Sequence, residues 1–95
     1  MHTQVAKSYV LLENGSEHTL EYDLFSGRAN NGVTLYGIKI TQLCGEYIAS
    51  ESAIISPNKE RTLQTILLFA KNFVFPISLR DLIDDISAFQ TYLLI

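Results

Sequence analysis

The stretch NGSEHTLEYDLF, residues 14–25, decides which fold the rest of the chain can adopt. In it, the apolar residues Leu20, Tyr22 and Leu24 alternate with acidic ones, and a period of two is typical of a strand with one buried face. The stretch opens with Asn-Gly, which tolerates the positive φ at both central positions of a type I′ turn. It therefore predicts a hairpin formed with the chain that precedes it.

Three neighbouring segments also have the character of strands. Residues 4–13 are rich in apolar side chains and end at the Asn-Gly turn. Residues 26–32 contain two glycines and an Asn pair, so we expect a flexible connection to a strand over 33–44. Gly45 permits another tight reversal before a weaker strand over 46–55. Four sequential strands with short connections predict an antiparallel meander.

At Ser56 the apolar period changes from two to about 3.6 residues, which indicates a helix. Pro57 suits the first helical position, and we expect the helix to run from 57 to 73. Its apolar stripe comprises Leu63, Ile66, Leu67, Ala70 and Phe73.

A second helix is expected over 79–93, after Pro76 interrupts the first. Ser78 with Asp81 three residues later resembles a capping box, in which the hydroxyl satisfies a free helix N–H. The predicted fold is therefore α+β: a four-stranded antiparallel meander followed by two C-terminal helices packed on one sheet face. Residues 1–95 should form a single domain.

Composition argues against several classes of protein, namely disordered, membrane-inserted, secreted and nucleic-acid-binding ones. The chain has 95 residues, 47% of them hydrophobic and 18% charged, which is unlike a disordered protein. No apolar run approaches the length needed to span a bilayer, and residues 1–4 begin no secretory signal, so we expect neither membrane insertion nor secretion. The net charge of -3 and the lack of a basic stripe argue against direct nucleic-acid binding. A lone cysteine fits a reducing, cytoplasmic location.

Few residues point to catalysis or metal binding. Cys44 has no nearby cationic residue in the sequence to lower its pKa, and His2 and His18 would reach a nucleophile only through long-range contacts. Three acidic residues share one side of the second predicted helix and could present acidity to a basic partner, although capping and solvation explain them better than a metal site does. They are Asp81, Asp84 and Asp85. We therefore expect no cofactor, no metal and no catalytic residue.

Tyrosines are spread evenly over the predicted sheet, one to each strand. They are Tyr9, Tyr22, Tyr36 and Tyr47. Aromatic pairing across strands is the favoured explanation, and a partner-binding platform is the alternative. Several strands are apolar at both parities, and one helical layer cannot cover both faces of a sheet. Either the sheet curls, or a partly apolar face remains for another copy or a different protein.

Two motifs carry a family resemblance. Tyr36-Gly37-Ile38, in a predicted strand, and PISLRDLIDD, residues 76–85, together resemble a family of small uncharacterised proteins from clostridia-like Gram-positive bacteria. The resemblance covers most of the chain, strands first and helices last. It implies a bacterial cytoplasmic protein, or one from a phage or mobile element, and it carries no catalytic residues.

The leading functional expectation is a small acidic, non-enzymatic interaction or regulatory module that binds a protein, including a second copy as a homodimer. A narrower alternative is a phage-type inhibitor of a host defence nuclease, of the anti-CRISPR kind, because an acidic protein can occupy a basic channel. A third is a small-ligand-binding module with a concave, tyrosine-lined sheet face, or a minor enzyme that uses Cys44 or the three acidic residues.

Overall fold

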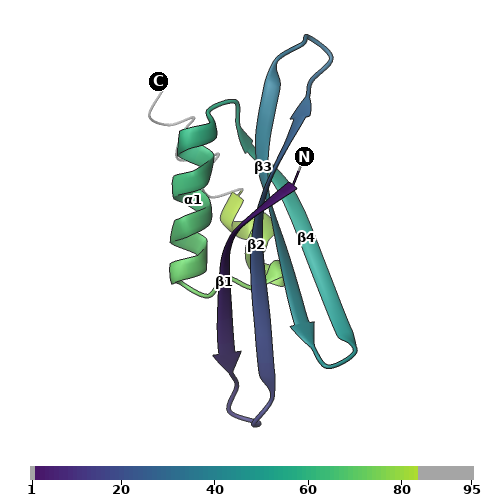
Figure 1. Ribbon diagram of the computed structural model, residues 1–95, viewed down its shortest axis with the longest axis vertical. Helices are drawn as coiled ribbons and strands as arrows, with labels where there is room; N and C mark the ends of the chain where they lie inside the picture. The colour runs from purple at the N-terminus through teal and green to yellow at the C-terminus, as the bar shows by residue number, and fades with distance from the viewer. Residues whose placement is uncertain (1, 84–95) are drawn as a thin grey trace.

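The computed structural model describes residues 2–83 and confirms the α+β fold (Figure 1). Four antiparallel strands form one sheet in the order β1-β2-β3-β4, which is also their order in the sequence. Helix α1 and the segment that follows it lie against one face, which we call the inner face. The strands span β1 His2–Leu11, β2 Glu17–Arg28, β3 Thr34–Cys44 and β4 Tyr47–Ser56.

The core lies between the inner face and α1. Leu20, Tyr22 and Ile40, from the two central strands, have no exposed surface, and neither does Ile66 of the helix. The Tyr22 hydroxyl donates a hydrogen bond of 2.9 Å to the Val74 carbonyl oxygen, just beyond α1. This bond satisfies the polar group that the aromatic ring carries into the core.

Both hairpins that flank β2 use the same turn, and it is not the type I′ turn predicted. In the first, the Gly15 N–H donates to the Leu12 carbonyl and the Leu12 N–H donates to the Ser16 carbonyl, each at 2.9 Å. Gly15 has a φ of 85°, whereas Asn14 does not have a positive φ. This pattern is a type I turn followed by a glycine bulge, and Asn14 accepts the Ser16 N–H instead of adopting a left-handed conformation.

The second hairpin repeats this turn at Gly32, which also has a φ of 85°. The Gly32 N–H donates to the Ala29 carbonyl, and Asn31 accepts the Val33 N–H. The predicted flexible connection over 26–32 is therefore wrong, because β2 continues to Arg28 and a tight turn follows. The third reversal, at Gly45, is confirmed; only this first central residue has a positive φ, as in a type II′ turn.

Helix α1 spans Lys59–Lys71, two residues shorter at each end than predicted. Pro57 is not its first residue, because the Asn58 side chain caps the helix by accepting the Arg61 N–H at 3.0 Å. At the other end, Phe73 adopts a φ of 53°, and the Val74 N–H donates to the Phe69 carbonyl. This is a Schellman ending with phenylalanine where glycine is usual.

The buried side of α1 differs in part from the predicted stripe. Ile66 and Ala70 are buried as expected, but Leu67 and Phe73 are about half exposed and Phe69 takes their place in the core. Phe73 leaves the stripe because the helix has already ended before it.

The second predicted helix begins at Leu79 as expected, but a 3-10 turn leads into it. A 3-10 turn, η1, spans Pro76–Ser78, and residues 79–83 continue as helix. Ser78 lies inside this turn and its N–H donates to the Phe75 carbonyl, so the predicted capping box with Asp81 does not form. Leu79 is fully buried. The remainder of the predicted helix, 84–93, lies outside the described residues.

Candidate functional site

The four tyrosines do not form one platform. Tyr22 is fully buried and serves the core, whereas Tyr9 is 72% exposed and Tyr47 is 58% exposed. Alternation along the strands places Tyr9 on the outer face and the other three, including the half-buried Tyr36, on the inner face. The strand register places no two of them directly opposite each other, so the expected cross-strand pairing of tyrosines is wrong.

The acidic trio is only partly described. Asp81 is exposed, while Asp84 and Asp85 lie outside the described residues. Within residues 2–83, no three His, Cys, Asp or Glu side chains gather closely enough to hold a metal ion. In the same range, no helix has both the length and the apolar character that crossing a bilayer requires.

His18 sits in a small polar network at the end of β2. Its Nε2 lies 3.0 Å from the Ser16 hydroxyl and its Nδ1 lies 3.0 Å from Nε2 of Gln42 on β3. Because the amide nitrogen of Gln42 can only donate, Nδ1 is the accepting nitrogen and Nε2 faces the Ser16 hydroxyl. The Ser16 hydroxyl then donates to Asn14 at 2.6 Å. Both ring nitrogens are therefore engaged with partners other than the half-buried Cys44 thiol.

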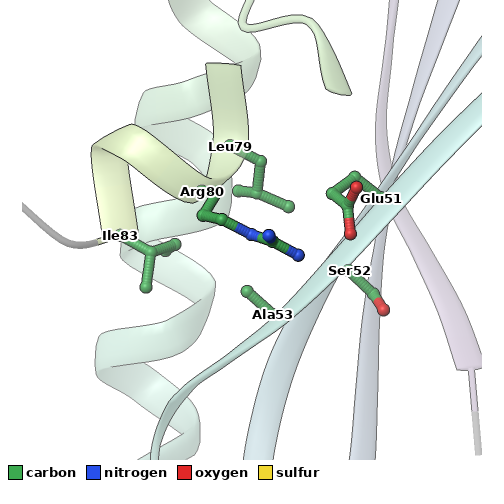
Figure 2. Close-up of a pocket in the computed structure, with 6 residues that line it drawn as sticks. All are labelled: Glu51, Ser52, Ala53, Leu79, Arg80 and Ile83. Atoms are coloured by element: carbon green, nitrogen blue, oxygen red, sulfur yellow. The ribbon is translucent and has the colours of Figure 1, made fainter. Parts of the chain in front are cut away.

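Two hollows lie on the inner face beside β4. The smaller is a cavity of about 60 Å³ between β4 and residues 79–83, where Arg80 extends toward Glu51 (Figure 2). The larger is an open groove of about 450 Å³ near the 3-10 turn. Residues that line this groove are Gln42, Tyr47, Ala49, Ser50, Glu51, Phe75, Pro76 and Ile77. Ile77, at 89% exposure, is the most exposed large apolar side chain of residues 2–83.

The outer face is polar at its centre. Glu21 lies opposite Lys7 of β1, and Asp23 lies opposite Lys39 of β3. Opposite charges in directly opposed positions stabilise a sheet and favour contact with water. Apolar side chains on this face gather instead near the strand ends and along β4, where Ile48 is 67% exposed.

Both outermost strands leave one row of backbone groups without a strand partner within residues 2–83. They differ in how well that edge is protected. β1 carries Lys7 and a register shift between Gln4 and Ala6, and both features discourage pairing with another chain. β4 has no lysine and no proline, its register is regular from 47 to 54, and its irregularity comes only at its last residues.

The sequence alone does not single out this edge as a site. Its signal was present in the composition of β4, which holds one charged residue, Glu51, in ten. A meander places its last strand at an edge, and the structure adds that no strand of residues 2–83 pairs with the free side of β4.

The chain matches one family of known sequences. Residues 1–88 match the model of a family of unknown function, DUF6514, and the chain belongs to that family. This confirms the expectation of an uncharacterised family. No curated protein and no solved structure matches the chain.

Proposed function

We propose that this chain is a non-enzymatic protein-interaction module that makes its contact through β4. The observation that carries the proposal is the unprotected edge of that strand. Among residues 2–83, its ten residues end a four-stranded sheet, and backbone N–H and C=O groups without a strand partner at such an edge can accept an added strand.

The side chains of β4 support the same proposal. Ile48 and Ile54 are 67% and 46% exposed, and Tyr47 is 58% exposed. Apolar groups beside free backbone groups add affinity and specificity to strand pairing, because alternate side chains contact the partner. The groove next to the 3-10 turn continues this surface onto the inner face.

Affinity capture tests the proposal. The tagged chain, the variant Ile48→Lys/Ser50→Lys and the control Gln4→Lys are expressed in the same cells. Lysines protect a sheet edge, so the double variant should recover none of the proteins that the unmodified chain recovers. The control places a lysine on the opposite edge, at an exposed position, and should recover the same proteins as the unmodified chain. Recovery that the double variant leaves unchanged would refute a contact through β4.

A further inference from the structure

We propose that the strand β4 accepts is β4 of a second copy of this chain, paired antiparallel about a two-fold axis at Glu51. This inference rests on the proposed function and names its partner. It would join the two four-stranded sheets into one continuous sheet.

The sequence of β4 is a palindrome around Glu51. Residues 48–54 read Ile-Ala-Ser-Glu-Ser-Ala-Ile, which is the same in both directions. In an antiparallel pair centred on Glu51, each residue meets its own kind: isoleucine meets isoleucine, alanine meets alanine and serine meets serine. Such a self-complementary edge suits an isologous interface, in which the same patch is used by both subunits.

The register of β4 against β3 keeps the whole palindrome in a regular strand. Residues 47–54 pair with β3 without interruption, so the whole palindrome is a regular strand. A two-fold axis perpendicular to the sheet keeps inner faces together and outer faces together. Ile48 and Ile54 both lie on the outer face, and centring on Glu51 is the only register that sets each opposite the other. Centring the pair on Ser52 sets each isoleucine opposite a serine, and centring it on Ser50 sets Ile48 opposite a serine and Ile54 opposite Glu46, so both shifts lose this apolar contact.

The centre of this pairing carries charges of both signs. The inner face brings two Glu51 carboxylates opposite each other, and like charges in that position oppose pairing. Arg80 extends from the helical residues 79–83 toward Glu51 across the small cavity (Figure 2). The symmetric dimer therefore holds two arginines beside two carboxylates, and these charges balance at the axis.

The other edge of the sheet limits the assembly to two copies. β1 would lie at both outer ends of the joined sheet, with its lysine and its irregular register. Those features discourage further strand addition. The geometry thus gives a closed dimer instead of a growing fibre.

Oligomeric state is measured on the purified full chain by light scattering coupled to size exclusion over a concentration series. We expect a monomer–dimer equilibrium. Arg80→Ala should weaken the dimer several-fold, because it leaves the two Glu51 carboxylates facing each other without a balancing charge. Ile48→Lys/Ser50→Lys should abolish it, while Gln4→Lys should leave it unchanged. A monomer at every concentration would overturn the proposal, and so would a dimer that the double variant does not weaken.

Disulfide trapping tests the register. In a Cys44→Ser background, Glu51→Cys places thiols on the axis, within the Cβ separation that opposed strand residues provide. It should form a covalent dimer under mild oxidation. Ala49→Cys thiols would be displaced from each other by four residues along the strand and should not cross-link. Cross-linking of Ala49→Cys in preference to Glu51→Cys would refute the axis at Glu51.

The two proposals can fail separately. If the purified chain stays monomeric while capture from cells still depends on β4, the strand accepts a different protein. In that case self-pairing is refuted and the interaction module stands. If capture does not depend on β4 either, both are refuted.

Discussion

The two faces of the sheet differ in what their side chains do: the inner face forms the core, and the outer face is charged at its centre. On the inner face, the side chains of β2 and β3 are buried under α1, as with Leu20 and Ile38, which have no exposed surface. On the outer face, the same strands carry Glu21, Asp23 and Lys39 at their centre. The sheet therefore needs only one helical layer, and the outer apolar side chains are concentrated where they can meet another chain.

The largest expected effect contrasts one isoleucine from each environment. Ile40→Ala removes a fully buried side chain and should cost about 2–5 kcal/mol in the free energy of unfolding. Ile48→Ala changes an exposed side chain and should alter the free energy of unfolding by about 0.5 kcal/mol or less. Denaturant titration at a concentration where the chain is monomeric measures both. Equal costs would contradict the division between the two faces.

The outer face is closely packed at Gly37, as a core would be. A Cβ built there would lie 2.5 Å from both the Ala53 carbonyl oxygen and the ring of Phe25, which covers the glycine from the opposite strand. Gly37→Ala should therefore destabilise the fold by about 1–3 kcal/mol. Gly27→Ala is the matched control, because a Cβ there meets no atom within 4 Å. If the two alanine variants unfold at the same denaturant concentration, the close packing on the outer face is refuted.

Tyr22 tests the polar part of the inner face. Tyr22→Phe removes the hydrogen bond to Val74 and should cost about 0.5–1.5 kcal/mol. Tyr9→Phe, on the outer face and 72% exposed, should cost almost nothing. A thermal melt of each variant makes the comparison, and equal losses would argue against the buried bond.

The same tyrosine predicts an alkaline dependence. Burial raises the pKa of Tyr22 from 10.0 to about 12, so the folded state holds its phenol proton more tightly than the unfolded state does. The stability from this group is complete below about pH 10 and is lost as the pH rises through about 12. Unfolding measured across that range should be less pH-dependent in Tyr22→Phe than in the unmodified chain.

The smallest expected effect belongs to the charged centre of the outer face. A double-mutant cycle on Asp23 and Lys39, each replaced by alanine, should give a coupling free energy of about 0.2–1 kcal/mol. Added salt should reduce it, because the pair borders water. If the coupling free energy exceeds the loss of stability in Tyr22→Phe, the charged pair on the outer face stabilises the fold more than the buried hydrogen bond on the inner face does, which would contradict this ranking.

The sequence predicts the strands well, because period-two alternation is strongest in the strands that bury one face, as at Leu20, Tyr22 and Leu24. It mispredicts details that depend on neighbouring atoms. Asn14 looks like half of a type I′ turn until its side chain accepts the Ser16 N–H, and Leu67 looks like core until the angle of α1 against the sheet is known. The candidate site is harder to predict from the sequence than the strands are, because a sheet edge depends on which strands lie beside it in space. Tyr22 and Tyr47 are both tyrosines in predicted strands, yet Tyr22 is in the core and Tyr47 lies on the edge strand β4.

Strand order carries a consequence for how the chain reaches its native state. Each strand of the sheet pairs with its neighbour in the sequence, so every hairpin closes a short loop and can form without waiting for distant segments. The contact between Ser8 and Ala70 is different, because its partners are 62 residues apart. Folding should then proceed through early hairpins and late docking of α1. Until α1 has docked, the apolar inner face of the newly formed sheet would be exposed to water and to other chains.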